Sequence, residues 1–387
     1  MKRFDNSIFV TRPYLPSKDE FKAGIDEIWN NWWLTNDGPL LGKFHNRLAE
    51  YLQVPPTNMA IFNNGTMALE IGYHAMGLAG GEVITTPFTF VATSHALKRI
   101  GATPVFADVD PETLCLDPAK VEKLITQRTK AIVPVHVYGN ICDIKGFERL
   151  SKKYGIPVIY DAAHAFGVRM EQVDKDLSTI APTKYNSAET IGAAGDMSMF
   201  SLHPTKLYHS CEGGILVFKD PSLQERLFNL RNFAITTETE CVDVGTNAKM
   251  NELQALMGLE CLKAVEGLLA ARHRVFAAYR QAFAGRADIR LMDAPQANHA
   301  YCPVLLKDFE TRERVYARLK DCNVFSRRYF YPLLTDFAPY AYGRGTCPVA
   351  EDASRRILTL PTYFDLPDAD VGSIAANVIE IVSGGVA

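Results

Sequence analysis

Short apolar runs recur between helix-sized segments over residues 59–218, and this alternation restricts the possible folds more than any other feature of the chain. Strand-like runs separated by helical stretches are typical of a mainly parallel sheet that helices cover on both faces. We therefore predict an α/β fold for this part of the chain. The expected strands cover residues 60–62, 82–84, 104–106, 131–135, 157–160, 197–200 and 215–218.

The length of the chain and a change of pattern near residue 250 predict two domains. A chain of 387 residues, 47% of them hydrophobic, is long enough to form more than one core. After residue 250 the apolar spacing predicts one long helix over 251–284, and then mixed strands and helices, with strands at 300–305 and 324–327. We expect residues 1–249 to form an N-terminal segment and a large domain, and residues 250–387 a smaller C-terminal α+β domain.

Charge and cysteine spacing argue against several classes of protein. Formal net charge is -3, with 41 basic and 44 acidic residues interspersed, so neither nucleic acid nor a membrane surface is an expected partner. No apolar run approaches the roughly 20 residues of a membrane span, and the first residues lack the apolar run of a secretory signal. We expect a cytoplasmic protein. The eight cysteines have no CxxC spacing, so neither a disulfide framework nor a metal centre is predicted.

Polar residues follow several of the expected strands directly. They are residues 63–66, 86–88, 136–138, Asp161 and residues 201–206. Ligands of α/β sheets bind beyond the carboxyl ends of the strands. We expect these separate stretches to converge on one pocket.

Lys206 and Asp161 together indicate the chemistry of that pocket. Most lysines are solvated, but Lys206 closes a segment that leaves an expected buried strand, so its amine is expected to point inward. Asp161 also ends an apolar run, where its carboxylate caps a helix or holds a buried cation. A lysine amine captures an aldehyde, and a carboxylate keeps a pyridine nitrogen protonated. The pair predicts an enzyme that uses pyridoxal phosphate (PLP).

Other candidates are weaker when each is considered alone. Gly65 and Thr66 open an apolar helix, which is either an anion site or an ordinary strand-to-helix turn. Ser201 offers a hydroxyl suited to phosphate, Phe90 lies against a cofactor ring or in the core, and His164 lies near the same ring or packs in the core. Neither GxGxxG nor GxxxxGK[ST] occurs to indicate another phosphate-binding fold.

These residues resemble the DegT/DnrJ/EryC1/StrS family of sugar-nucleotide aminotransferases, and the likeness covers nearly the whole chain. The resemblance implies the aspartate aminotransferase fold (PLP fold type I). It implies that Lys206 is the Schiff-base lysine and Asp161 the partner of the pyridine nitrogen. The motifs that carry it are residues 12–13 (RP), 34–39 (LTNDGP), 64–69 (NGTMAL), 88–93 (FTFVAT), 161–167 (DAAHAFG), 200–206 (FSLHPTK), 245–252 (GTNAKMNE) and 328–332 (RYFYP).

The same resemblance implies roles for further residues and a homodimer with shared active sites. Gly65, Thr66 and Ser201 would contact the phosphate, Phe90 would lie beside the ring, and His164 near the ring hydroxyl. Asn247 would reach the phosphate of the neighbouring subunit, and His203 and Lys249 would hold a carboxylate or the substrate. Arg231 and Tyr331, with Arg327, Arg328 and Tyr329, are the candidates for recognising the nucleotide. Arg327 and Arg328 are equally consistent with surface charge.

The resemblance also implies a reaction. L-glutamate would give its amino group, leaving as 2-oxoglutarate, and a nucleotide-linked keto sugar would accept it. The LHPTK and TNAKM segments favour C-4 of dTDP-4-keto-6-deoxyglucose, giving a 4-amino sugar for a surface polysaccharide such as the O-antigen of lipopolysaccharide, or for a glycosylated metabolite. The alternatives are amination at C-3, a UDP- or GDP-linked sugar, a PLP-dependent sugar dehydratase, and a regulator that binds PLP without turnover. Lys206 argues against the dehydratase, because that branch replaces the lysine with histidine.

Overall fold

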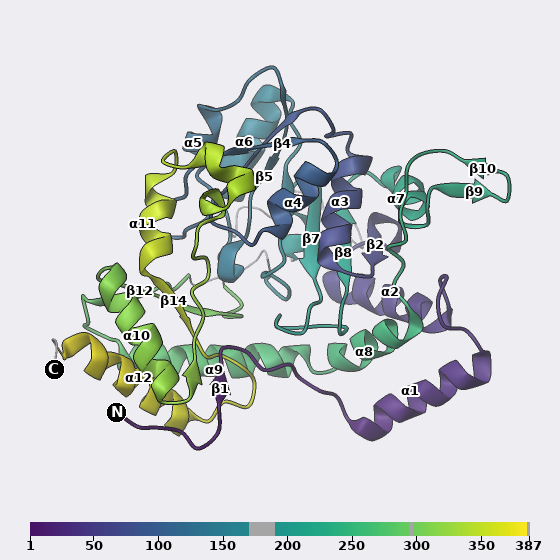
Figure 1. Cartoon of the computed structure of the whole chain (residues 1–387). Helices are drawn as coiled ribbons and strands as arrows, with labels where there is room; N and C mark the ends of the chain where they lie inside the picture. The colour runs from purple at the N-terminus through teal and green to yellow at the C-terminus, as the bar shows by residue number, and fades with distance from the viewer. Residues whose placement is uncertain (170–189, 295–296, 385–387) are drawn as a thin grey trace.

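The computed structural model describes residues 1–169, 190–294 and 297–384 (Figure 1). None of the helices within these ranges is both long and apolar enough to cross a membrane. The helices are α1 (Lys18–Asn31), α2 (Pro39–Leu52), α3 (Gly65–Ala75), α4 (Ala92–Arg99), α5 (Pro118–Glu122), α6 (Ile144–Tyr154), α7 (Leu223–Arg231), α8 (Glu252–Leu262), α9 (Val265–Ala282), α10 (Phe309–Asp321), α11 (Pro348–Arg356) and α12 (Asp368–Ser383). The strands are β1 (Ile8–Phe9), β2 (Met59–Phe62), β3 (Glu82–Thr85), β4 (Thr103–Phe106), β5 (Thr129–Val133), β6 (Ile159–Asp161), β7 (Met197–Ser201), β8 (Gly214–Phe218), β9 (Ile235–Thr237), β10 (Glu240–Cys241), β11 (Ile289–Leu291), β12 (Cys302–Leu306), β13 (Val324–Phe325) and β14 (Ile357–Leu360).

A mixed sheet forms the centre of the molecule. Strands β2, β8, β7 and β6 are hydrogen-bonded in that order, as are β4, β3 and β5. Parallel bridges from Ile132 to Val158 and from Val135 to Asp161 join the two groups into one sheet. Only β8 runs antiparallel to its neighbours in this sheet. The α/β fold with a mainly parallel sheet is confirmed, and each strand expected between residues 60 and 218 is present.

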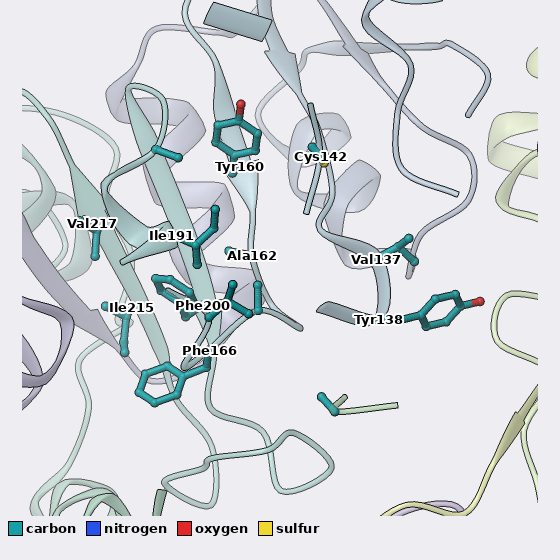
Figure 2. Packing of buried hydrophobic residues seen from close by; sticks show 14 of the residues in the cluster. Val137, Tyr138, Cys142, Tyr160, Ala162, Phe166, Ile191, Phe200, Ile215 and Val217 are labelled. Carbon is teal, nitrogen blue, oxygen red and sulfur yellow. The ribbon is translucent and has the colours of Figure 1, made fainter. Parts of the chain in front are cut away.

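Alternate residues of the strands bury opposite faces of this sheet. Phe62 and Met199 face a layer that includes α3, α4 and α7, whereas Ile61 and Phe200 face a layer that includes α2, α6 and α8. Figure 2 shows the second layer around Phe200, whose ring meets that of Phe166 edge-on with centroids 5.8 Å apart. Because helices cover both faces, the polar ends of the strands are the part of the sheet left for chemistry.

A second sheet organises the C-terminal part of the chain. Strands β11, β12 and β14 are antiparallel, and their side chains pack with α9, α10 and α12. The N-terminus joins this region, because β1 pairs with β13 and the amino group of Met1 lies 2.7 Å from Glu380. Figure 1 shows the N-terminus near α12. The predicted boundary at residue 250 stays a prediction.

The prediction of one helix over 251–284 is wrong. The chain forms α8 and α9, and the turn at Lys263 and Ala264 separates them. Gly258 of α8 packs closely against Phe44 of α2, and Val265 at the start of α9 packs in the same core, whereas Val275 farther along α9 packs in the C-terminal core. Apolar spacing continues across the turn, so the pattern alone does not reveal the change of partner.

Candidate active site

The loop that carries Lys206 connects β7 to β8, and backbone hydrogen bonds within the loop hold its shape. Leu202 N–H donates to the Gly213 carbonyl at 2.8 Å, and Ser210 N–H donates to the Leu202 carbonyl at 3.1 Å. Lys206 N–H donates to the His203 carbonyl at 2.9 Å. These bonds hold the base of the loop at the carboxyl end of β7, where ligands of α/β sheets bind.

The Lys206 amine contacts Tyr301 and lies within electrostatic reach of three predicted site residues, Asp161, His164 and His203. Its Nζ is 3.3 Å from the Tyr301 hydroxyl. Burial is the main cause that lowers the pKa of His164 and of His203, and the positive charge of Lys206 lowers both further. At Asp161 burial raises the pKa, and the charge of Lys206 acts in the opposite direction. Residues from three different stretches therefore surround one amine.

Asp161 ends β6 as a buried carboxylate. One oxygen accepts from the Thr93 hydroxyl at 2.7 Å and the other from Ala163 N–H at 3.1 Å. Burial raises the pKa of Asp161, although these hydrogen bonds and the charge of Lys206 act in the opposite direction. Residues 161–169 contain no helix, so the carboxylate does not cap one there. It is a desolvated anion suited to a cationic partner.

His164 is held as a neutral ring with a defined tautomer. Its Nδ1 accepts from the backbone N–H of Tyr138 at 3.0 Å, so Nε2 carries the proton of the neutral imidazole. Burial lowers the pKa of His164 well below its usual value, and Lys206 lowers it further. The imidazole stacks on Phe330 and is tilted against Tyr301, with centroids 6.2 and 4.6 Å apart. His164 therefore offers one N–H donor.

The residues predicted to contact the phosphate lie where α3 begins and β7 ends: Gly65 and Thr66 are the first residues of α3, and Ser201 is the last residue of β7. A Cβ on Gly65 would lie 3.1 Å from Cβ and 3.3 Å from Oγ of Ser201, so the helix start and the end of β7 are in close approach. Asn64 caps the helix through its side chain. A helix N-terminus with an adjacent hydroxyl suits an anion.

Phe90, Asn247 and Lys249 lie at more open positions. The side chain of Phe90 is 55% exposed at the turn before α4. Asn247 is exposed, and its backbone pairs with that of Asn232. Lys249 donates to Asn232 Oδ1 at 2.7 Å and lies over the Phe233 ring. No contact of Asn247 or Lys249 with Lys206 is found among the described residues, and their roles remain predictions.

Arg231 and Tyr331 are engaged with the protein's own groups. The Arg231 guanidinium is buried and donates to the Ile61 carbonyl at 2.7 Å and to Asp37 at 2.5 Å. The Tyr331 ring lies under the Arg312 guanidinium, 4.2 Å from its carbon, beside α10. Arg231 fastens the turn after α1 to β2, so a direct contact with substrate requires it to leave these partners.

His203 and Arg327 lie at the rim of the same site. Burial lowers the pKa of His203, and the charges of Lys206 and Arg327 lower it further. His203 Nε2 is 3.6 Å from the Glu212 carboxylate. Arg327 is exposed and donates to the hydroxyl of Tyr329. An exposed cation whose charge reaches His203 is a feature that suits an anionic substrate.

Three residues of the site were assigned no role from the sequence. They are Thr93, which holds Asp161; Tyr138, which fixes His164; and Tyr301, which contacts Lys206. Thr93 lies within the 88–93 motif, and Tyr301 is a polar aromatic residue at the start of an expected strand. Those were the available signals, and neither reveals a partner far away in the sequence.

The described residues fit pyridoxal phosphate. The cofactor has an aldehyde, a pyridine nitrogen, a ring hydroxyl and a phosphate, which require an amine, an acid, a hydrogen-bond donor and an anion site. Lys206, the desolvated Asp161, His164 Nε2 and the close approach of Gly65 to Ser201 offer these groups. Fold and site define the class of a PLP-dependent aminotransferase.

Comparisons with known proteins identify the family. The model of the DegT/DnrJ/EryC1/StrS aminotransferase family matches residues 16–379. The dTDP-4-amino-4,6-dideoxy-D-glucose transaminase of Shigella dysenteriae is 38% identical over 97% of this chain and 100% of its own. GDP-perosamine synthase of Caulobacter vibrioides is 32% identical over 97% of this chain and 98% of its own. The structure of DesI in the presence of its TDP-sugar product superposes with a TM-score of 0.88, at 33% identity, over 99% of this chain and 95% of that one.

The chain belongs to the DegT/DnrJ/EryC1/StrS aminotransferase family. It is a sugar aminotransferase whose cofactor is pyridoxal phosphate. The sequence-based predictions of family, fold class and cofactor are confirmed. The roles of individual site residues stay predictions.

Proposed function

We propose that this enzyme transfers the amino group of L-glutamate to C-4 of dTDP-4-keto-6-deoxyglucose, releasing 2-oxoglutarate and forming a dTDP-linked 4-amino sugar. The observation that carries the proposal is the position of the Lys206 amine beside Tyr301, within electrostatic reach of buried Asp161 and His164. A surface lysine would have none of these neighbours.

The protein's own groups divide the work. Bound PLP supplies an electron sink that stabilises negative charge on the substrate carbon. Lys206 would hold the aldehyde and, once displaced by substrate, move the proton between carbon atoms as a general base. Asp161 would keep the pyridine nitrogen protonated, and His164 Nε2–H would donate to the ring hydroxyl. The helix α3 N-terminus and Ser201 would bind the phosphate.

The choice of nucleotide sugar is supported by the relatives. Transaminases of Shigella dysenteriae and Escherichia coli, 38% and 35% identical, are named for dTDP-4-amino-4,6-dideoxy-D-glucose. Three relatives named for GDP- or UDP-linked sugars are 31–33% identical. The proposed product is a cytoplasmic precursor of a surface polysaccharide such as an O-antigen.

A homodimer is part of the proposal. Helix α1 and the β9–β10 hairpin extend from the body of the subunit (Figure 1). Trp29 and Trp32 on and after α1 are 66% and 91% exposed, and Val244 beyond the hairpin is 86% exposed. Large exposed apolar side chains on extended segments favour a protein partner, and we propose a second copy of this chain. Trp32→Ser is expected to weaken the dimer in sedimentation experiments, with Thr57→Ser as an exposed control on another surface.

The test of the reaction separates binding, donor and acceptor. The protein is loaded with PLP and treated with borohydride, and the modified peptide is mapped; we expect the label on Lys206. Unreduced enzyme is then treated with L-glutamate, which should remove the aldehyde absorbance and release 2-oxoglutarate. The keto sugars linked to TDP, GDP and UDP are added one at a time.

Each outcome of this test is decisive. Fastest recovery of the absorbance with the TDP sugar supports the proposal, and faster recovery with a GDP or UDP sugar overturns the choice of nucleotide. Deoxygenation without amino transfer would identify a dehydratase. An absorbance that glutamate leaves unchanged would contradict amino transfer from this donor.

A further inference from the structure

The C-terminal part of the chain supplies a hydroxyl to the Lys206 amine. Tyr301 directly precedes β12, so it comes from the antiparallel sheet, whereas Lys206 follows β7 of the mixed sheet. The hydroxyl lies 3.3 Å from Nζ, and the amine lies 5.8 Å from the ring centroid of the same tyrosine. The two groups are thus brought together across about 95 residues of sequence.

The ring of Tyr301 is fixed on more than one side. The residue is 2% exposed. Its ring centroid is 4.6 Å from that of His164, 6.1 Å from that of Tyr138 and 6.2 Å from that of Tyr329. A buried ring in such contacts has few alternative rotamers, so its hydroxyl occupies a defined position.

The backbone before Tyr301 is fastened to the segment that follows Asp161. Asn298 Nδ2 donates to the carbonyls of His164 and Phe166, both at 2.8 Å, and its Oδ1 accepts from Ala300 N–H at 3.0 Å. A Cβ on Gly139 would lie 2.3 Å from Asn298 Oδ1, so only glycine allows this approach.

A second buried group fastens the same backbone from the other side. The Arg272 guanidinium, on α9, donates to the carbonyls of Ala300 and Thr362 at 2.8 and 2.9 Å. Arg272 is 3% exposed. Asn298 and Arg272 are both buried, and each donates to two backbone carbonyls. Together they fix the position of the Tyr301 backbone, and with it the position of the hydroxyl relative to Lys206.

From this arrangement we propose that Tyr301 orients the Lys206 amine, both for capture of the cofactor aldehyde and for proton transfer after the amine is displaced; the inference rests on the proposed function. A lysine side chain has several rotatable bonds, and a free amine would sample many positions. A hydrogen bond to a fixed hydroxyl restricts those positions to the side of the reacting atoms. Asn298 and Arg272 are positioning residues, because they act through Tyr301.

The test uses Tyr301→Phe in the full-length protein, because this change removes the hydroxyl and keeps the ring. The first measurement is the rate at which cofactor-free protein captures PLP, followed by absorbance and fixed with borohydride. The second is kcat and KM of the glutamate half-reaction. We expect capture and kcat each to fall about tenfold, the effect of losing one hydrogen bond to a charged or reacting group, with KM unchanged.

Tyr340→Phe is the matched control. Its hydroxyl is also buried and hydrogen-bonded, 2.5 Å from His95 Nδ1, but it lies outside the site. This variant should lose some thermal stability and keep the capture rate. Asn298→Ala should slow capture in the same direction as Tyr301→Phe.

The outcomes distinguish the inference from the proposed function. Wild-type protein that captures PLP at Lys206, with Tyr301→Phe equal to it in both rates, would overturn the role of Tyr301 and leave the proposed function standing. An effect of Tyr301→Phe on KM alone would also overturn it. Wild-type protein that captures no PLP would overturn both.

Discussion

The central sheet and the C-terminal sheet β11–β12–β14 differ in where their polar groups lie. In the C-terminal sheet, every residue of β12 and β14 is buried, and all of them are apolar except Thr359. The central sheet has an equally apolar interior, but its strands end in Asp161 and Ser201. The reactive groups thus lie at the ends of the central strands, where helices no longer cover the sheet. The C-terminal sheet contributes to the site through Tyr301, which directly precedes its middle strand, β12.

This difference means that function and stability should respond to different substitutions. At the strand ends of the central sheet, burial disfavours the charged forms of titratable side chains, which raises the pKa of Asp161 and lowers the pKa of His164. Groups inside the C-terminal sheet contribute packing alone. Three predictions probe the contrast.

The largest expected effect is the loss of turnover in Lys206→Ala. Removal of the amine removes both the covalent attachment and the base, so amino transfer should fall by at least about a thousandfold. Thermal unfolding should stay close to wild type, because the change is local. Lys206→Arg keeps the charge without a nucleophilic amine and should be equally inactive, whereas Lys152→Ala, an exposed lysine on α6, should be fully active. A Lys206→Ala enzyme that releases 2-oxoglutarate at the normal rate would remove this residue from the mechanism.

Leu358→Ala should separate stability from function in the C-terminal sheet. Leu358 is 0% exposed on β14, opposite Val304 of β12. We expect the free energy of unfolding to decrease by about 2–5 kcal/mol, through lost burial and the cavity that remains. Denaturant titration measures this change, and the specific activity of the folded fraction should change less than about twofold. A large loss of kcat in folded protein would show that this sheet does more than pack.

The smallest expected effect is a gain of stability in cofactor-free Asp161→Asn. Because burial raises the pKa of Asp161 above its unfolded value near 3.8, the folded state binds the proton more tightly than the unfolded state. The stability that this carboxyl contributes is therefore complete below about pH 3.8 and is lost as the pH rises through the folded pKa.

Asparagine does not ionise. Its Oδ1 is able to accept from Ala163 N–H and its Nδ2 to donate to the Thr93 hydroxyl, so the variant should be the more stable protein at pH 7, by a margin that shrinks toward pH 4. Thermal unfolding of both proteins across this range measures the margin. Addition of PLP should stabilise the wild type more than the variant, and turnover of the variant should be lost. A wild-type protein that is the more stable of the two at pH 7 without cofactor would contradict the burial argument.

Much of the fold was predictable from local pattern. Each strand from residue 60 to 218 follows from a short apolar run, because alternate side chains must be buried on both faces of a covered sheet. The break between α8 and α9 was not predictable in this way, since apolar spacing continues across Lys263 and Ala264. The core against which the chain packs changes farther along α9, between Val265 and Val275, and no local window of sequence shows that change.

The site shows the same division. Asp161 stands out because a carboxylate directly after a buried strand needs a reason to be there, and Lys206 and His164 stand out because they lie in the short segments that leave such strands. Arg231 illustrates the limit of that reasoning, because a conspicuous cation predicted to bind nucleotide is buried against Asp37 and Ile61. Whether a cation faces a ligand or its own protein depends on the packing around it.

The sequence by itself determined the strands and the positions of an amine, Lys206, and an acid, Asp161, after two of them. The motifs around these two residues determined the family and its cofactor. Only the tertiary structure decided that Thr93 holds Asp161, that a backbone amide of Tyr138 sets the tautomer of His164, and that Tyr301 reaches Lys206 from the other sheet. The physical reason is that strand formation and burial depend on near neighbours in the chain, whereas a hydrogen bond depends on a distance of about 3 Å between atoms that only the folded packing brings together.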